Sequence, residues 1–154
     1  MLSQNYSAAL GALSEVPEGA KLLSFVGRSC EAGGGSNRME HLPALAIIRR
    51  HAFSNEQWAN DGAQLLRSIY PQGNEIERHF SRNPSQLVTP PDCPNPYEKP
   101  LNWALKNFPR DKFDYIWLIA PPPYDARLLD DTQEVWRNGQ HSLHRIERKI
   151  EPSN

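Results

Sequence analysis

Residues 113–119 form a run of mostly apolar side chains that ends directly in a proline loop at residues 120–125. Apolar residues at successive positions indicate a strand that is buried on both faces, as central strands of α/β sheets are. Open α/β sheets bind ligands in the crevice outside the carboxyl ends of their strands. The loop is therefore the first predicted site, with Tyr124 and Asp125 as candidate ligand-binding residues.

The composition favours one domain and provides no overall charge that would attract a strongly charged partner, so such a partner would need a local patch. A chain of 154 residues, 38% of them hydrophobic, is long enough for one core and too short for two comfortable ones. Lys and Arg number 17 against 18 Asp and Glu, so no overall positive field attracts nucleic acid. No stretch approaches the roughly 18 apolar residues of a membrane span, and no export signal is recognised. We expect a single domain over residues 1–154 without a nucleic-acid partner.

Turn formers and hydrophobic spacing divide the first half of the chain into short elements. Apolar residues at helical spacing stop at Pro17 and Gly19, and a glycine-rich segment separates the two apolar runs that follow. Ser54 with Gln57 three residues later fits a capping box, which predicts the start of a helix. The expected elements are a helix at residues 3–15, strands at 21–26 and 42–48, a helix at 55–66 and a short strand at 66–70, with a long loop at 27–40.

The second half of the chain is rich in proline. Prolines crowd between Pro84 and Pro123, which predicts a long loop at residues 81–100. Pro100 suits the first position of a helix that leads into the strand at 113–119. The remaining expected elements are a helix containing Leu128, Leu129 and Val135 and an edge strand at residues 142–149. The sequence thus predicts a three-layer α/β fold, with a small, mostly parallel sheet, flanking helices and a proline-rich central loop.

Four blocks of sequence carry a family resemblance over most of the chain. Residues 40–58, followed by residues 62–66, 84–88 and 113–123, resemble the soluble C-terminal portion of multi-spanning inner-membrane proteins of alphaproteobacteria, which are glycosyltransferase-like. The resemblance implies an accessory domain at the periplasmic face of the membrane, with no catalytic residue and no cofactor of its own. It implies two partners, the membrane-helix portion of the parent protein and a lipid-linked sugar or glycan. This chain begins at Met1 without those helices, so we expect an excised domain, a fragment or a free-standing relative.

The two cysteines, Cys30 and Cys93, both lie in predicted loops. In an exported domain an even number of cysteines is compatible with one disulfide, whereas in a cytosolic chain the same residues would be two thiols. Closing a loop of about sixty residues would stabilise the fold by roughly 3 to 4 kcal/mol through chain entropy. Both alternatives remain open at the level of sequence.

Basic residues at the end of the run 42–48 suggest an anion-binding patch. Arg49 and Arg50, with His51, are expected to gather with Arg28 and Arg38 of the glycine-rich loop. Guanidinium groups bind phosphate oxygens in pairs, so the phosphate of a lipid-linked sugar would suit such a patch. The alternative is a solvated rim or a set of ion pairs within the chain.

One histidine is a candidate for proton transfer, and none suggests a metal site. His41 beside Glu40 would act as a general base if both lined the crevice, because imidazole titrates near neutral pH. The five histidines show no recognised metal-ligand spacing, so we expect no metal.

A competing hypothesis is a small soluble enzyme that uses the crevice after residue 119. Residues 113–124 are similar to the strand and loop of amino-group methyltransferases, where Asp or Asn precedes Pro-Pro-Tyr, and S-adenosylmethionine is the cofactor that this similarity implies. Here Pro121 stands in the place of the acid, which removes the acceptor for the target amine. A third possibility is an interaction module that binds neither sugar nor nucleotide.

Overall fold

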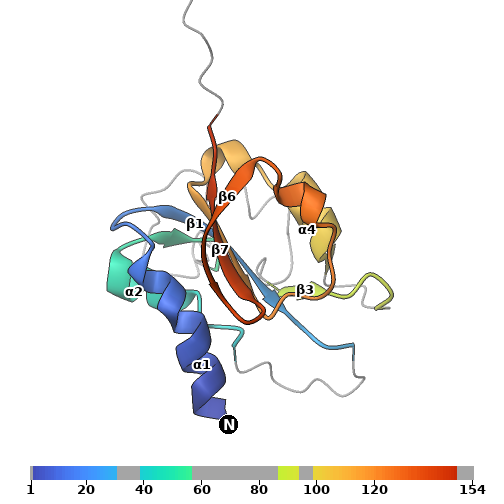
Figure 1. Cartoon of the computed structure of the whole chain (residues 1–154), viewed down its shortest axis with the longest axis horizontal. Helices are drawn as coiled ribbons and strands as arrows, with labels where there is room; N and C mark the ends of the chain where they lie inside the picture. Colours follow the sequence, from blue (N-terminus) through green and yellow to red (C-terminus); the bar gives the residue numbers. More distant parts are fainter. Residues whose placement is uncertain (1, 31–38, 57–86, 94–98, 149–154) are drawn as a thin grey trace, which may run out of the picture.

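The structure, a computed structural model, describes residues 2–30, 39–56, 87–93 and 99–148. One mixed sheet runs through the middle of these residues, with helices on both of its faces (Figure 1). Helices α1 (Leu2–Leu10) and α2 (Ala44–Arg50) cover one face, and α4 (Leu101–Asn107) covers the other. The predicted three-layer α/β architecture is confirmed.

The sheet order is β4-β3-β1-β5-β7-β6, with β2 also paired to β1. The strands are β1 (Lys21–Gly27), β2 (Phe53–Ser54), β3 (Leu87–Thr89), β4 (Lys99–Pro100), β5 (Tyr115–Ile119), β6 (Thr132–Asn138) and β7 (His141–Ile146). Strand β1 runs parallel to β2, β3 and β5, and β3 runs parallel to β4. Strand β7 is antiparallel to both β5 and β6. The sheet is therefore mostly parallel, with an antiparallel hairpin at one edge.

The two central strands are buried on both faces, as the apolar run predicted. Along β5, the residues from Ile116 to Ile119 have no exposed surface, and their side chains alternate between two cores. Trp117 belongs to the core beneath α1 and α2, whereas Leu118 belongs to the core beneath α4, where Phe108 and Phe113 also pack. Strand β1 alternates in the same way, so the β1–β5 pair forms the centre of the fold.

Three predicted elements are confirmed in type, and each begins within one residue of its predicted start. The helix expected at residues 3–15 is α1 followed by a 3-10 turn, η1 (Gly11–Ser14). The strand expected at 21–26 is β1. The helix expected from Pro100 is α4, with Pro100 at its N-cap, where a missing N–H costs nothing.

The prediction of a strand at residues 42–48 is wrong, because this segment contains helix α2. Short apolar runs do not distinguish a strand from a helix by periodicity, and the alanines and leucine of this run are good helix formers. The run is also one-sided: Ala46 is fully buried and Ile48 is 71% exposed. His51, in the left-handed region with φ 48°, ends the helix.

The C-terminal predictions also need correction. Leu128 and Leu129 lie in a short 3-10 turn, η3 (Ala126–Leu129), and Val135 lies in β6 rather than in a helix. The strand expected at the edge is β7, which lies between β5 and β6 and is therefore not an edge. The residues Asn138 and Gly139 are a hairpin signal, and Gly139 adopts a positive φ of 58° in that turn. Another 3-10 turn, η2 (Arg110–Lys112), precedes β5.

The helix predicted at residues 55–66 and the strand predicted at residues 66–70 lie, after Glu56, outside the described residues.

The side chain of Asn55 completes the hydrogen bonding of β1 between the residues that pair with β2 and those that pair with β3. Strand β5 occupies one edge of β1, and β2 and β3 pair with the two ends of the other edge, which leaves Ser24 between them. The carboxamide of Asn55 bridges this gap. Its Oδ1 accepts from the Ser24 N–H at 2.7 Å, and its Nδ2 donates to the Ser24 carbonyl at 2.9 Å. Since Asn55 is only 4% exposed, water does not compete for these groups.

A disulfide joins Cys30 and Cys93, whose Cα atoms lie 5.4 Å apart. Cys30 follows the carboxyl end of β1 and Cys93 follows that of β3, and the Arg28 N–H also donates to the Val88 carbonyl at 2.8 Å. The covalent bond thus closes a sequence separation of 63 residues between two neighbouring strands. Of the two alternatives for the cysteines, the structure contains the disulfide and not two thiols.

Replacing Asn55 with Asp is expected to lower the free energy of unfolding by at least about 2 kcal/mol. The substitution removes the donor to Ser24 and places a charge at a buried site. Urea denaturation measures the change, and Asn138→Asp, at an exposed position of β6, is the matched control with little expected effect. Equal stability of the two variants would show that Asn55 does not complete the sheet.

Removing the disulfide with the double variant Cys30→Ser, Cys93→Ser is expected to lower the free energy of unfolding by roughly 3 to 4 kcal/mol. The cause is the larger conformational freedom of the unfolded chain once the loop is open. Denaturation of the oxidised parent, the reduced parent and the variant measures this loss. The reduced parent should match the variant, and an undiminished stability in both would refute the closed loop.

Candidate functional site

At the carboxyl end of β1, where the crevice was predicted, the proline loop lies directly against the strand. A Cβ atom on Gly27, the last residue of β1, would lie 1.9 Å from the carbonyl oxygen of Ala120 and 3.2 Å from Pro122. Only glycine permits this close approach, and Ala120 itself adopts a left-handed conformation with φ 43°. The first residues of the loop therefore rest directly on the end of β1.

The predicted ligand-binding residues of this loop have partners within the chain. Asp125 caps η3: its Oδ1 accepts from the Arg127 N–H at 3.1 Å, and its own N–H donates to Asn102 of α4 at 2.8 Å. The hydrogen bonds from Arg127 lower the pKa of the Asp125 carboxyl. Tyr124 is partly buried and packs against the core beneath α4. Both side chains thus hold the loop in place.

A polar cluster that sequence reasoning missed lies on β6 and β7. His144 Nε2 lies 2.9 Å from Ser142 Oγ and 3.9 Å from Glu134 Oε2, and Arg137 pairs with Glu134. Burial lowers the pKa of His144, although the charge of Glu134 partly opposes this. Ser142 is only 1% exposed, so a substrate cannot reach its hydroxyl in this conformation. The register of the β6–β7 hairpin brings these side chains together, and no spacing in the sequence indicates that they are close.

His41 forms its ion pair with a residue other than its neighbour Glu40. Its Nδ1 lies 2.7 Å from Oε1 of Glu56. The His41 side chain is 78% exposed and that of Glu56 is 9% exposed, and burial raises the pKa of the Glu56 carboxyl despite the histidine. A carboxylate in this position orients an imidazole for proton transfer. The two residues are fifteen positions apart in the sequence, and no sequence pattern indicated that they would pair.

The predicted cluster of arginines is not brought together. Arg28 follows the carboxyl end of β1, whereas the Arg50 carbonyl accepts from the Gly19 N–H at 2.8 Å, just before the amino end of β1. Arg50 Nε also donates to the Val16 carbonyl at 2.6 Å, so its side chain joins α2 to the preceding segment. Arg49 is exposed on α2, and Arg38 lies outside the described residues.

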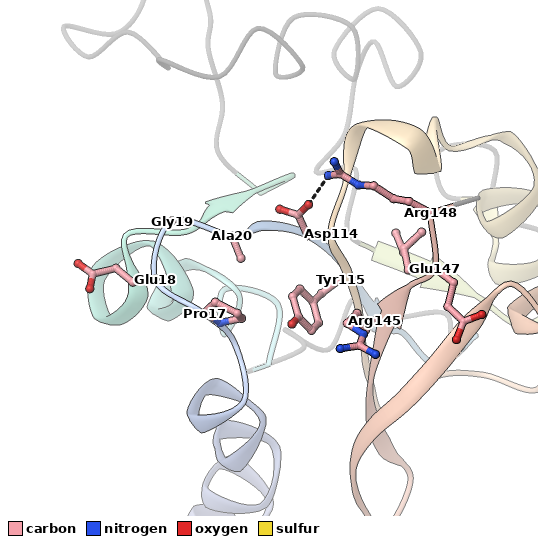
Figure 2. A pocket seen from close by; sticks show the side chains of 10 residues that line it. Pro17, Glu18, Gly19, Ala20, Asp114, Tyr115, Arg145, Glu147 and Arg148 are labelled. Atoms are coloured by element: carbon pink, nitrogen blue, oxygen red, sulfur yellow. Dashed lines mark hydrogen bonds and ion pairs between the residues drawn. The ribbon is translucent and has the colours of Figure 1, made fainter. Parts of the chain in front are cut away.

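An open hollow of about 700 Å³ lies at the opposite end of the sheet from the proline loop (Figure 2). It is formed by the amino ends of β1 and β5, the carboxyl end of β7 and the segment before β1. We call it the basin; its lining residues are Pro17, Glu18, Gly19, Ala20, Asp114, Tyr115, Arg145, Ile146, Glu147 and Arg148. Arg50 and His51 lie beside it, because Gly19 bonds to Arg50 and Glu18 lies 3.8 Å from His51.

Asp114 makes the wall of the basin rigid. Its Oδ2 accepts from the Lys21 N–H at 2.9 Å, and its Oδ1 accepts from the Arg148 guanidinium at 2.6 Å. Its backbone N–H donates to the Lys21 carbonyl at 2.8 Å, and its carbonyl accepts from the Ile146 N–H at 2.9 Å. One residue thus connects the ends of β1, β5 and β7 and holds Arg148 against the wall.

The interior of the basin combines an aromatic ring with a guanidinium group. Tyr115 and Arg145 are directly paired across β5 and β7, and Figure 2 shows their side chains next to each other, between Pro17 and Glu147. Arg145 donates to the neutral amide of Gln133 at 2.5 Å, so this contact does not neutralise its charge. None of the lining residues is Ser, Thr, Cys, His or Lys. The arrangement suits non-covalent binding of an anionic group better than covalent chemistry.

No family model, curated protein or solved structure matched this chain. Among the described residues, no helix has the length and apolar character needed to cross a membrane. The same residues contain no group of three or more His, Cys, Asp or Glu side chains placed to hold a metal ion.

The two arginines at the end of α2 are expected to differ in their effect on stability. Arg50→Ala removes the hydrogen bond to Val16 and should lower the free energy of unfolding by about 1.5 kcal/mol. Arg49→Ala, on the exposed side of the same helix, should change it by less than about 0.5 kcal/mol. Chemical denaturation of both variants measures the difference. A neutral Arg50→Ala would leave Arg50 available as a ligand-binding group.

Proposed function

We propose that this chain is a ligand- or partner-binding domain without catalytic activity of its own. It belongs to a glycosyltransferase-like bacterial membrane protein and works at the periplasmic face of the inner membrane. The observation that carries the binding role is the basin, an open hollow whose walls are fixed by Asp114 and whose interior presents Arg145 and Tyr115. Rigid walls favour binding because little conformational freedom is lost when the ligand enters.

The chemistry of the basin favours a ligand that carries both an anionic group and hydroxyl groups. The Arg145 guanidinium offers a planar pair of donors to phosphate oxygens. The Tyr115 ring supplies an apolar surface beside it, and the carboxylates of Glu18 and Glu147 at the rim accept from hydroxyl groups. A phosphorylated or diphosphate-linked sugar combines these features, which agrees with the lipid-linked glycan that the family resemblance implies.

The disulfide supports the location. Bonds between cysteines form and persist in oxidising compartments such as the bacterial periplasm, and they are rare in the cytosol. The Cys30–Cys93 bond is therefore compatible with an extracytoplasmic domain.

The competing methyltransferase hypothesis has less support from the geometry. Its cofactor would need the crevice after β5, where Ala120 lies against Gly27. The candidate residues are also engaged within the chain, Tyr124 by packing against the core and Asp125 by hydrogen bonds with Arg127. S-adenosylmethionine binding is its direct test, and saturable binding to the parent would favour the enzyme.

A soluble prenyl-diphosphate-linked sugar is the probe for the basin, with isothermal titration calorimetry as the measurement. Arg145→Ala is expected to weaken binding at least about tenfold, because the guanidinium provides the main contact with the diphosphate. Arg127→Ala is the matched control, since Arg127 is 84% exposed and lies beyond the proline loop. Inorganic pyrophosphate tests the anionic contribution alone. Equal affinity of Arg145→Ala and the parent, or no binding by the parent, would overturn the role of the basin.

A further inference from the structure

Directly after β5, the backbone of Ala120 adopts a conformation that alanine disfavours. Ala120 has a φ of 43°, in the left-handed region that non-glycine residues rarely adopt. Its carbonyl oxygen lies against Gly27, in space that no other residue type would leave open. Such a conformation persists only where surrounding contacts hold it, so the contacts of Ala120 decide whether the proline loop stays on the end of β1.

The backbone N–H of Ala120 is held by a histidine side chain. It donates to Nδ1 of His141 at 3.0 Å. His141 is the first residue of β7, opposite the point where the β5–β7 pairing ends, and its ring extends the hydrogen bonding of the sheet by one further group. Nδ1 can accept this bond only while it carries no proton, so the neutral ring must hold its proton on Nε2.

Protonation of His141 reverses this contact. In the imidazolium both ring nitrogens are donors, so Nδ1–H would face the Ala120 N–H and the hydrogen bond would be lost. The residue is only 4% exposed, and burial lowers its pKa below the ordinary value because the cation is poorly solvated there.

Burial is the cause of the lowered pKa of His141, and no charged neighbour contributes to it. The ionisable groups on the elements around it, within the described residues, are Tyr6 on α1, Arg28 after β1, Tyr115 on β5, Tyr124 and Asp125 in the proline loop, Glu134 and Arg137 on β6, and His144 and Arg145 on β7. The Glu134–Arg137 pair acts instead on His144, two residues further along β7.

We propose that His141 is an acid-sensitive latch for the proline loop. The neutral imidazole holds Ala120, and with it residues 121–123, against the end of β1. Protonation releases the Ala120 N–H, and the strained backbone then relaxes away from Gly27. The crevice at the carboxyl ends of β1 and β5 thereby opens in acid and closes near neutral pH.

The sign of the pH dependence follows from the direction of the shift. The folded-state pKa lies below the unfolded value of 6.5, so the unfolded or released state binds the proton more tightly. The stabilising effect of the latch is complete above that value. It declines as the pH falls below 6.5 and is lost as the pH passes through the folded-state pKa. The latch and the basin lie at opposite ends of β5, so each can be tested without the other.

NMR spectroscopy of the complete chain from about pH 7.5 to about pH 4.5 tests the latch. The amides of Ala120 and Gly27 and the ring of His141 are followed together. After correction for the intrinsic exchange rate, we expect the protection of the Ala120 amide from hydrogen exchange to fall at least about tenfold in acid. The midpoint of this loss should coincide with the midpoint of the His141 titration. A titration of His141 that leaves the Ala120 amide unchanged would overturn the proposal, even without any variant.

Two variants separate the latch from general acid unfolding. His141→Asn keeps an acceptor near the position of Nδ1 but does not titrate, so the Ala120 amide should stay protected across the range. His144→Gln removes the other buried histidine of β7 and should keep the transition of the parent. Loss of the transition in His144→Gln, or its persistence in His141→Asn, would assign the acid response to another group. If His141→Asn does not fold, the coincidence of midpoints in the parent still decides the question.

Discussion

The parallel pairing of β1 with β5 is the interaction on which the rest of the structure depends. Both strands are buried on both faces, so water cannot satisfy any backbone group that the neighbouring strands leave unpaired. Three side chains complete the hydrogen bonding of these backbone groups. Asn55 bonds to Ser24 in the gap between β2 and β3, Asp114 bonds to the amino end of β1, and His141 bonds to the residue that follows β5. The polar residues of this core are therefore parts of the sheet's hydrogen-bond network.

These side chains give the two ends of the sheet different properties. At the amino ends, Asp114 connects three strands and leaves an open basin beside Arg145. At the carboxyl ends, where α/β sheets usually bind ligands, the close contact of Gly27 with Ala120 closes the crevice. The open hollow thus lies at the end opposite to the usual one. At the usual end, the proline loop is held by the bond from Ala120 to His141 and by the bond from Asp125 to Asn102.

Sequence reasoning succeeded where one physical signal dominated and failed where two signals competed. The buried strand β5, the helix after Pro100 and the α/β class followed from hydrophobic runs and proline chemistry. The strand predicted where α2 lies was wrong because an apolar run of seven residues is compatible with either helix or strand. Only the burial of one side of the run distinguishes the two. The prediction for the segment of β6 was wrong because the two leucines before it suggested a helix, although Asn138 and Gly139 indicate a hairpin.

By itself, the sequence determined which segments are buried, where the chain turns and that two cysteines were available for one bond, because these depend on local composition. Only the tertiary structure decided which polar side chains meet. The basin draws on three segments separated by many residues, and His41 pairs with Glu56 rather than with its neighbour. Tyr124 and Asp125, which the sequence suggested as ligand-binding residues, instead hold the proline loop, Tyr124 by packing and Asp125 by hydrogen bonds. Strand order and register bring such groups together, and both arise from long-range packing that no local pattern encodes.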